Sequence, residues 1–235
     1  MPPTPRSITL DDLAAALAAN AGASRRVVAL AGAPGSGKST TAKRLQCALT
    51  ETYGIATQIV PMDGYHYDDA VLAQLGRSDR KGAPDTFDVI GLKTTLTRLA
   101  PAFQTEPVAV PVFDRGLELS RAAGRLIDPA TRLVLVEGNY LLLNDQPWSQ
   151  LQPLFDLTIM LECDAQILRK RLLTRWRDLE YSLADAQQKV DGNDLPNARR
   201  VLADSSAPDY FLIHADAVRL AGDAKRPTAF KGKTT

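Results

Sequence analysis

The chain has 235 residues, a formal net charge of +1, 45% hydrophobic residues and 23% charged residues. This length fits one domain of generous size, or one domain with a lid, and disfavours two independent domains. A net charge near zero provides no strong field to attract nucleic acid or an anionic membrane, so we expect neither as a partner.

Cysteine content and apolar patterning indicate the compartment. Cys47 and Cys163 are the only cysteines, they form no CxxC pair, and the chain holds two histidines that could join them as ligands, so no metal cluster of that kind is predicted. The opening residues lack the unbroken apolar core of a signal peptide, and no run approaches the roughly 20 apolar residues that a membrane span needs. We therefore expect a reduced, cytoplasmic protein.

The first predicted element is an amphipathic helix, with Leu10, Leu13 and Leu17 on one face and Thr9 as its cap. After it, the run RVVALA at residues 26–31 is typical of a buried strand and leads into the glycine-rich stretch GAPGSGKST. Helical composition follows over residues 39–52. The order strand, loop, helix is therefore predicted here.

The same unit recurs further along the chain. Residues 55–60 predict a strand that ends at Pro61, and a helix follows from Asp88 until Pro101 stops it. Further buried strands are predicted at residues 107–113, 133–137, 156–161 and 210–214. Strands that alternate with helices predict a mainly parallel sheet covered by helices on both faces, which is an α/β fold with three layers.

The glycine-rich stretch predicts a phosphate-binding loop. Gly32, Gly37, Lys38 and Ser39 fill every fixed position of GxxxxGK[ST], between a predicted strand and a predicted helix. Backbone N–H groups can then surround phosphates, while Lys38 reaches the terminal phosphates and Ser39 holds magnesium. A glycine-rich turn without a ligand is the alternative, and it gives no reason for Lys and Ser to follow the last Gly. The candidate nucleotide contacts are Gly32, Ala33, Pro34, Gly35, Ser36, Gly37, Lys38, Ser39 and Thr40.

Two acidic residues follow strands and are therefore expected at the ligand-binding edge of a parallel sheet. Asp63 could accept the proton of an attacking hydroxyl, as a base does in phosphoryl transfer to an alcohol; its alternative is to cap the turn with Gly64. Glu137 could bind magnesium or its water shell; its alternative is a local hydrogen bond.

A long helical segment over residues 165–177 is rich in arginine and predicts a lid. Arg171 and Arg175 are spaced i, i+4 and share a face, so they could cover a transferring phosphate together. The alternative for each arginine is a solvated helix face.

Several motifs agree in type and order, and the sequence resembles the P-loop kinase family that includes uridine kinase, bacterial-type pantothenate kinase and phosphoribulokinase. The resemblance covers about residues 26–214. It depends on GAPGSGKST, MDGYH, RKGAPDTFDV, PVFDRG, VEGNYLLL and the arginine-rich lid. The combination of VEGNYLLL with NDLPNARR is similar to a branch described as nucleoside/nucleotide kinase-like, or as fructose-transport-associated kinases.

The resemblance implies a P-loop NTPase fold of three α/β/α layers with a helical lid, and it implies roles for single residues. Lys38 and Ser39 would serve phosphates and magnesium, Asp63 would be the base, Glu137 would lie near the metal, and Arg171 or Arg175 would be the lid arginine. The implied acceptor pocket consists of Tyr65, His66, Lys81, Asp85, Phe87, Arg115, Asn139, Tyr140 and Asn197. A lone histidine such as His66 is more often packed than catalytic, and helix capping is the alternative for Asn193 and Asn197. Relatives often have a Pro-Thr-basic run where this chain has residues 202–205, so base recognition by that stretch is not predicted.

The sequence therefore predicts an ATP- and Mg2+-dependent kinase that phosphorylates a hydroxyl of a small polar metabolite. A nucleoside, a pantothenate-like acid alcohol and a sugar are all compatible acceptors, and a P-loop regulatory protein or slow ATPase without an acceptor is the alternative function. The expected organisation is an N-terminal helical extension at 1–24, a kinase domain at 25–216 with the lid at about 165–195, and a flexible tail at 217–235. The resemblance makes a homodimer the assembly to test.

Overall fold

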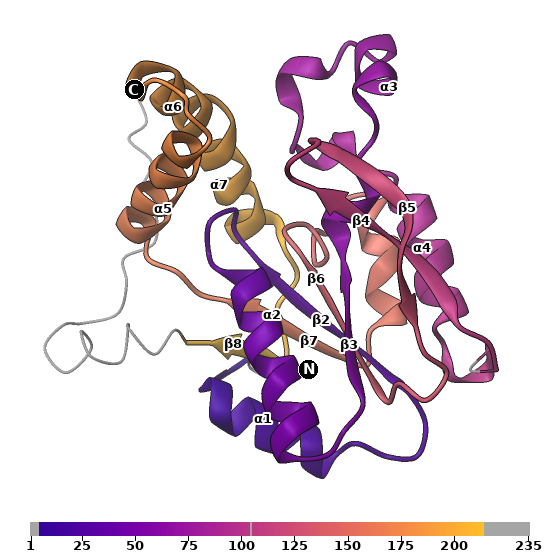
Figure 1. Cartoon of the computed structure of the whole chain (residues 1–235). Helices are drawn as coiled ribbons and strands as arrows, with labels where there is room; N and C mark the ends of the chain where they lie inside the picture. The colour runs from indigo at the N-terminus through magenta and orange to yellow at the C-terminus, as the bar shows by residue number, and fades with distance from the viewer. Residues whose placement is uncertain (1–4, 104, 214–235) are drawn as a thin grey trace, which may run out of the picture.

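A computed structural model describes residues 5–103 and 105–213 of the chain (Figure 1). Its centre is a six-stranded sheet in which every neighbouring pair is parallel. The strands lie in the order β1 (Arg6–Ile8), β8 (Tyr210–Leu212), β7 (Leu157–Leu161), β2 (Arg26–Gly32), β6 (Leu133–Gly138) and β3 (Thr57–Pro61). The predicted parallel α/β fold is thus confirmed.

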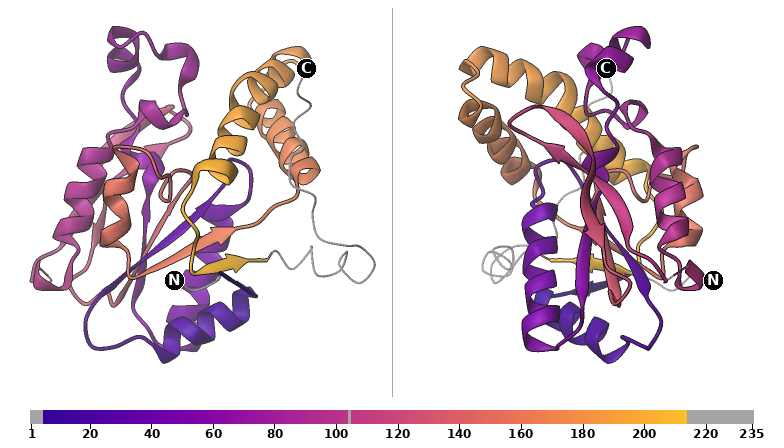
Figure 2. Two further views of the ribbon diagram at one scale, coloured as in Figure 1. Left: turned by 180° about the vertical axis from the view of Figure 1, so that it is seen from behind. Right: turned by 45° about the vertical axis from the view of Figure 1, so that its right-hand side comes forward.

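The central strand β2 shows why both faces of the sheet are covered. Its side chains alternate: Val27 and Ala29 join one buried cluster, whereas Val28 and Leu30 join another. Helices α1 (Leu10–Ala19) and α2 (Lys38–Cys47) pack on the face that carries Val28 and Leu30. Helix α4 (Val89–Arg98) packs on the face that carries Val27 and Ala29. Figure 2 shows the sheet between these two layers of helices. Each fully buried leucine contributes about 1.5–3 kcal/mol to this packing.

Side-chain caps define where several helices begin. Thr9 caps α1 as predicted, because its side chain accepts a hydrogen bond from the backbone N–H of Asp12. Asp88 caps α4 in the same way. In contrast, α2 begins after Gly37 without a side-chain cap. The first N–H groups of α2 are therefore left for a ligand.

The strand predicted at residues 107–113 exists, but the prediction that it belongs to the parallel sheet was wrong. It is β4 (Val108–Asp114), which pairs antiparallel with β5 (Leu119–Ile127) in a separate two-stranded sheet. The sequence of β5, LSRAAGRLI, is mostly exposed and poor in β-branched residues, so it gives no strand signal. The resulting hairpin places residues 115–118 beside the ligand-binding edge of the main sheet.

The N-terminal region contributes a strand as well as the predicted helix. Strand β1 pairs with β8, with Ile8 opposite Leu212, and Leu13 and Leu17 of α1 are buried in the cluster that contains Leu30. Three residues are too few to produce the alternation that predicts a strand. His214 and the tail predicted at 217–235 lie outside the described residues.

The segment predicted as a lid, at about residues 165–195, contains α5 (Ala165–Asp178), α6 (Leu183–Lys189) and the π-helical turn η7 (Val190–Asp194), and α7 (Leu195–Asp204) follows it. In Figure 1 these helices stand at the top left, across from α3 and the β4–β5 hairpin. Within the described ranges, no helix combines the length and apolarity needed to cross a bilayer. The remaining elements are η1 (Ala48–Thr52), η2 (Met62–Tyr65), α3 (Asp69–Gln74), η3 (Ser78–Arg80), η4 (Pro84–Thr86), η5 (Pro101–Phe103) and η6 (Trp148–Leu154).

Candidate functional site

Strand register brings the predicted phosphate and metal residues to one edge of the sheet. Ala31 at the end of β2 lies opposite Gly138, and Pro61 at the end of β3 lies opposite Glu137. The carboxyl ends of parallel strands are where α/β sheets bind ligands. The glycine-rich loop, Glu137 and the turn after Pro61 therefore meet in one place.

The glycine-rich loop has the backbone conformation of a phosphate cradle. Gly35 and Gly37 have φ angles of +78° and +94°, in the left-handed region that favours glycine. A Cβ at Gly32 would lie 2.9 Å from the Ser36 hydroxyl and 3.2 Å from Leu161. The loop thus closes tightly at its base and leads directly into the uncapped start of α2, an arrangement that suits an anion.

Lys38 is a buried cation in this cradle. Its Nζ donates a hydrogen bond to the Ala33 carbonyl at 2.9 Å, and its side chain is almost fully buried. Burial lowers the pKa of the Lys38 ammonium to about 8, against the opposing effect of Glu137 and Asp63. A polyphosphate bound in the loop would supply the charge partner that a buried ammonium needs.

Ser39 and Glu137 form a pair suited to magnesium. The Ser39 hydroxyl donates to Oε1 of Glu137 at 3.1 Å, and Glu137 is buried. Burial, together with the Asp63 charge, raises the pKa of the Glu137 carboxyl. Magnesium prefers oxygen ligands and is usually held by one or two protein groups plus phosphates and water, which this pair fits.

Asp63 lies on the turn η2 and faces the same cavity. One of its oxygens, Oδ2, accepts a hydrogen bond from Nη2 of Arg115 at 3.0 Å. The cavity measures about 210 Å³. It is lined by Pro34, Gly35, Gly37, Lys38, Ser39, Thr40, Asp63, Arg115, Glu137, Asn139 and Arg175. The structure thus brings together the candidate base, the phosphate loop and the metal pair.

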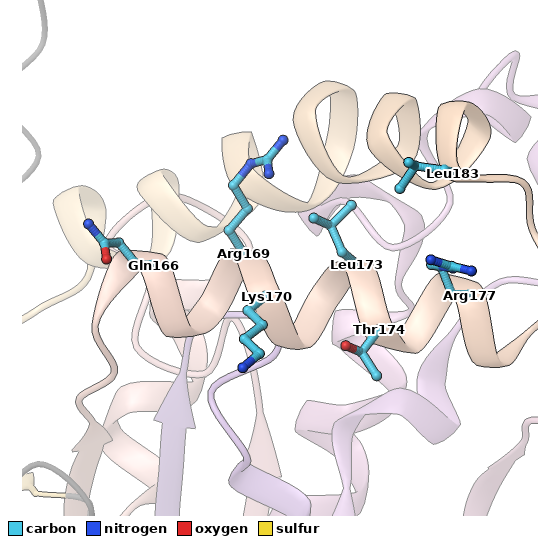
Figure 3. Close-up of a pocket in the computed structure, with 7 residues that line it drawn as sticks. All are labelled: Gln166, Arg169, Lys170, Leu173, Thr174, Arg177 and Leu183. Atoms are coloured by element: carbon cyan, nitrogen blue, oxygen red, sulfur yellow. The ribbon is translucent and has the colours of Figure 1, made fainter.

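Arg171 and Arg175 face the phosphate loop, as their i, i+4 spacing predicts, and the other basic residues of α5 do not. Nη1 of Arg171 donates to the Ser36 carbonyl at 3.1 Å, and Arg175 lines the cavity beside Asp63. Arg169 pairs with Asp191 at 3.1 Å. Arg169, Lys170 and Arg177 also line an open groove of about 430 Å³ along α5 (Figure 3). Arg171 therefore contacts the loop and Arg175 lines the cavity, which keeps both as candidates for binding a phosphate.

The predicted acceptor residues are only partly brought together. Arg115 and Asn139 line the cavity. Tyr65, Phe87 and Tyr140 are buried in the core. The Tyr140 hydroxyl donates a hydrogen bond to the Gly82 carbonyl oxygen at 2.5 Å. These three side chains therefore do not line the cavity.

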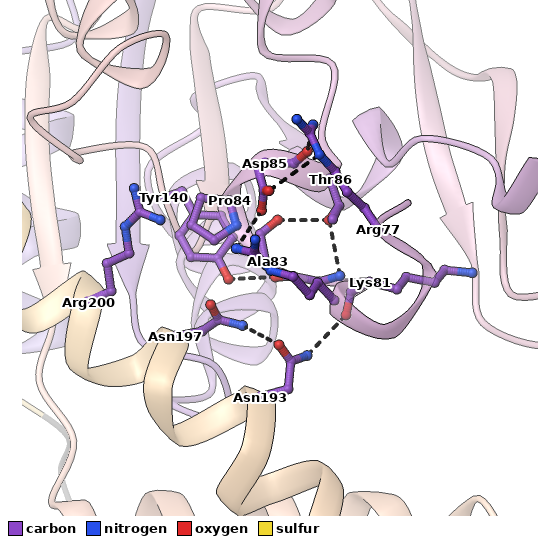
Figure 4. Close-up of polar contacts among 12 residues, drawn as sticks. Arg77, Lys81, Ala83, Pro84, Asp85, Thr86, Tyr140, Asn193, Asn197 and Arg200 are labelled. Carbon is purple, nitrogen blue, oxygen red and sulfur yellow. Dashed lines mark hydrogen bonds and ion pairs between the residues drawn. The ribbon is translucent and has the colours of Figure 1, made fainter. Parts of the chain in front are cut away.

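The remaining acceptor candidates belong to a polar network between α7 and the segment before α4 (Figure 4). Asn197 donates to Asn193 at 3.0 Å, and Asn193 donates to the Lys81 carbonyl at 3.1 Å. Asp85 is held by Arg77 at 3.5 Å and by Arg80 at 3.1 Å. None of these residues lines the 210 Å³ cavity. The Asn193 bond joins η7 to the segment before α4, whereas the Asp85 pairs stay within that segment.

His66 lies between aromatic rings next to Asp63. Its ring centroid is 4.0 Å from that of Phe87 and 5.3 Å from that of Phe113. Sequence reasoning missed Phe113, although it stands two residues before Arg115 in the motif PVFDRG. Burial lowers the pKa of the His66 imidazole to about 4, and the Lys81 and Arg115 charges add to this effect while Asp63 opposes it.

The low pKa of His66 predicts how stability depends on pH. The unfolded chain takes up this proton near the ordinary histidine pKa of about 6.5, whereas the folded chain resists it until about 4. The unfolded state therefore binds more protons between these values, and the free energy of unfolding falls by up to about 3 kcal/mol as pH drops through this window. We expect the unfolding free energy of His66→Asn to change much less with pH than that of the parent. Chemical denaturation between pH 7 and about pH 4 measures this dependence in both proteins. Equal slopes in the two proteins would contradict the assignment of a buried, neutral imidazole.

Known proteins place these features in a family. No family model matches the chain. A Schizosaccharomyces pombe protein provisionally named as a uridine kinase is 34% identical over 198 residues, covering 80% of this chain and 83% of that protein. The uncharacterised Escherichia coli protein YggC is 34% identical over 192 residues, covering 80% of this chain and 77% of YggC.

A solved structure agrees with these relatives. The crystal structure of a provisionally assigned fructose transport system kinase from Silicibacter sp. TM1040 is similar with a TM-score of 0.81 and 36% identity, covering 87% of this chain and 99% of that chain. The phosphate loop, the parallel sheet and these similarities agree. The chain belongs to the P-loop kinase family that includes uridine kinase, pantothenate kinase and phosphoribulokinase.

Proposed function

We propose that this protein transfers the γ-phosphate of ATP to a hydroxyl group of a small polar metabolite in the cytoplasm. The observation that carries this proposal is that Asp63 lines the same cavity as Lys38, Ser39 and Glu137. A protein that only binds or slowly hydrolyses ATP needs the phosphate loop, but it has no need of a carboxylate base beside it. The functional unit in this proposal is residues 25–216, with the lid over about 165–195.

Phosphate binding is the first role that we assign. The N–H groups of the loop and the first turn of α2 hold the phosphates, and Lys38 neutralises charge on the terminal ones. Arg171 and Arg175 approach from the lid and donate to the transferring group, whose charge is spread over its oxygens in the transition state. Lid closure excludes water, which would otherwise compete with the acceptor.

Proton transfer and metal binding are the second set of roles. Asp63 orients the acceptor hydroxyl and takes its proton as the alcohol oxygen bonds to the γ-phosphorus and ADP leaves with the electron pair. Ser39 and Glu137 hold magnesium, directly or through water. When bound, magnesium would supply positive charge that neutralises the phosphates.

The proposal is tested by ATP turnover with magnesium against a panel of nucleosides, pantothenate, glycerate, ribulose 5-phosphate and simple hexoses. ADP and phosphorylated product are followed in the same reaction. The expected result is that ADP appears with one acceptor class and that product matches it mole for mole. ADP formation that no acceptor stimulates, and that Asp63→Asn leaves unchanged, would instead support a slow ATPase.

A further inference from the structure

The candidate base is already occupied by a cation that belongs to neither the phosphate loop nor the lid. Nη2 of Arg115 lies 3.0 Å from Oδ2 of Asp63. Arg115 is located on the turn between β4 and β5 and lines the cavity. Figure 1 shows the β4–β5 hairpin across from α5. The Arg115 guanidinium uses one acceptor position of Oδ2 and competes there with a water molecule or an alcohol.

The Arg115 backbone is fixed while its guanidinium has room to move. The Asp114 carboxylate accepts hydrogen bonds from the backbone N–H groups of Gly116 and Leu117 at 3.0 and 3.2 Å. Those bonds hold the turn. The Arg115 side chain itself is 53% exposed, and its contacts are the ion pair with Asp63 and the Phe113 ring, whose centroid lies 5.9 Å away. A half-exposed ion pair of this kind is weak, so another anion can break it.

The surroundings of Arg115 favour such an anion. Nζ of Lys81 lies 5.8 Å from the centroid of the same Phe113 ring and donates to the Glu118 carbonyl at 2.8 Å. Arg175 lies close enough to Arg115 for their charges to interact. Lys81, however, pairs with Asp69 at 2.7 Å and does not line the cavity. The cations that the hairpin and α5 bring beside Asp63 are therefore Arg115 and Arg175. Arginine binds carboxylates and phosphates through two parallel hydrogen bonds, which a neutral hydroxyl cannot match.

We propose that Arg115 masks Asp63 until an acceptor carrying a carboxylate or a phosphate draws the guanidinium away. The inference depends on the proposed kinase function and narrows it: the acceptor is an anionic alcohol. Water lacks the charge that releases Arg115, so the empty site leaves ATP intact. Once the anion has released Arg115, Asp63 takes the hydroxyl proton, the alcohol oxygen bonds to the γ-phosphorus, and the bond to the ADP oxygen breaks.

The first test needs no acceptor. In Arg115→Met the mask is absent, and we expect ADP formation from ATP alone to rise about fivefold, the largest effect expected from losing a half-exposed ion pair. The double variant Asp63→Asn with Arg115→Met should lose that rise. Arg121→Met is the matched control, because Arg121 is on the same hairpin and pairs with Asp114 at 3.2 Å. A rise in hydrolysis is also a result that simple damage to the fold does not produce.

The second test compares acceptors that differ in charge: glycerate with glycerol, pantothenate with panthenol, and ribulose 5-phosphate with ribulose. In the parent we expect kcat/KM for the preferred anionic member to exceed that of its neutral partner at least about 100-fold. In Arg115→Met this ratio should fall below about tenfold, mainly through KM for the anionic member. The pairs also separate a carboxylate from a phosphate as the recognised group.

The outcomes separate this inference from the proposed function. A parent enzyme that phosphorylates a nucleoside, or a neutral member as well as its anionic partner, keeps the kinase function and overturns the anionic acceptor. Unchanged hydrolysis in Arg115→Met overturns the mask. If the parent phosphorylates no acceptor, the proposed function loses its support, while the first test still decides whether Arg115 masks Asp63.

Discussion

Replacing Asp63 with asparagine is expected to lower phosphoryl transfer about 1,000-fold while ATP affinity changes by less than about threefold. Asparagine has nearly the same shape but cannot accept the hydroxyl proton. The residues that we assign to the phosphates, Lys38 and Arg171, do not depend on Asp63 for their contacts, since they donate to the carbonyls of Ala33 and Ser36. Product formation measures the first effect, and titration calorimetry with ATP measures the second.

The control for this variant is Asp11→Asn, an exposed aspartate on α1, which should transfer phosphate like the parent. Full transfer by Asp63→Asn would remove Asp63 as the base. Loss of ATP binding together with transfer would mean that Asp63 supports the loop rather than the chemistry.

The substitution Gly64→Ala is also expected to lower phosphoryl transfer strongly, though less than Asp63→Asn, and the reason is steric. A Cβ at Gly64 would lie 2.3 Å from the carbonyl oxygen of Pro111 and 2.6 Å from its carbonyl carbon. These are backbone atoms of β4, so the turn that carries Asp63 must shift. We expect the free energy of unfolding to fall by about 1–3 kcal/mol and transfer to fall about 100-fold, because a displacement of roughly 1 Å is enough to disrupt a reactive geometry.

Gly22→Ala provides the matched control for Gly64→Ala. A Cβ at Gly22 meets nothing within 4 Å, so its free energy of unfolding should stay within about 0.5 kcal/mol of the parent value. Urea denaturation and product formation are measured on both variants. Parent-like stability and transfer in Gly64→Ala would show that β4 does not fix the turn.

The phosphate loop could be predicted from the sequence because all of its information is local. Gly32, Gly37, Lys38 and Ser39 are adjacent in the chain, and a strand followed by a helix is readable from apolar runs. Glu137 and Asp63 were predictable to the same extent, because Glu137 ends the predicted strand 133–137 and Asp63 comes just after the strand that ends at Pro61. Register then brings them together.

The i, i+4 spacing also distinguished Arg171 and Arg175 from the other basic residues of α5, but only because one face of α5 is regularly buried. Leu168 and Leu172 are fully buried and fix the rotation of the helix. Arg171 and Arg175 consequently face the loop. The sequence shows the periodicity of these residues, but the direction in which their face points is set by the residues that pack against α5.

The β4–β5 hairpin could not be predicted, and neither could the pairing that it creates. Strand β5 is exposed, with Ala123 at a positive φ of 53° and a register shift opposite Val110 and Val112, so it carries no period of two. Without the hairpin, nothing in the sequence brings Arg115 to Asp63, which is 52 residues away. The burial of Tyr140 and Phe87 likewise follows from aromatic packing against Trp148, a contact between distant segments.

The most direct test of the central claim follows the label from ATP labelled in its γ-phosphate, with magnesium and the acceptor panel, in the parent and in Asp63→Asn. We predict that the parent moves the label into the acceptor and releases little of it as inorganic phosphate. Asp63→Asn should move almost none. Label that appears only as inorganic phosphate, at equal rates in both proteins and with every acceptor, would contradict the assignment of a kinase with Asp63 as its base.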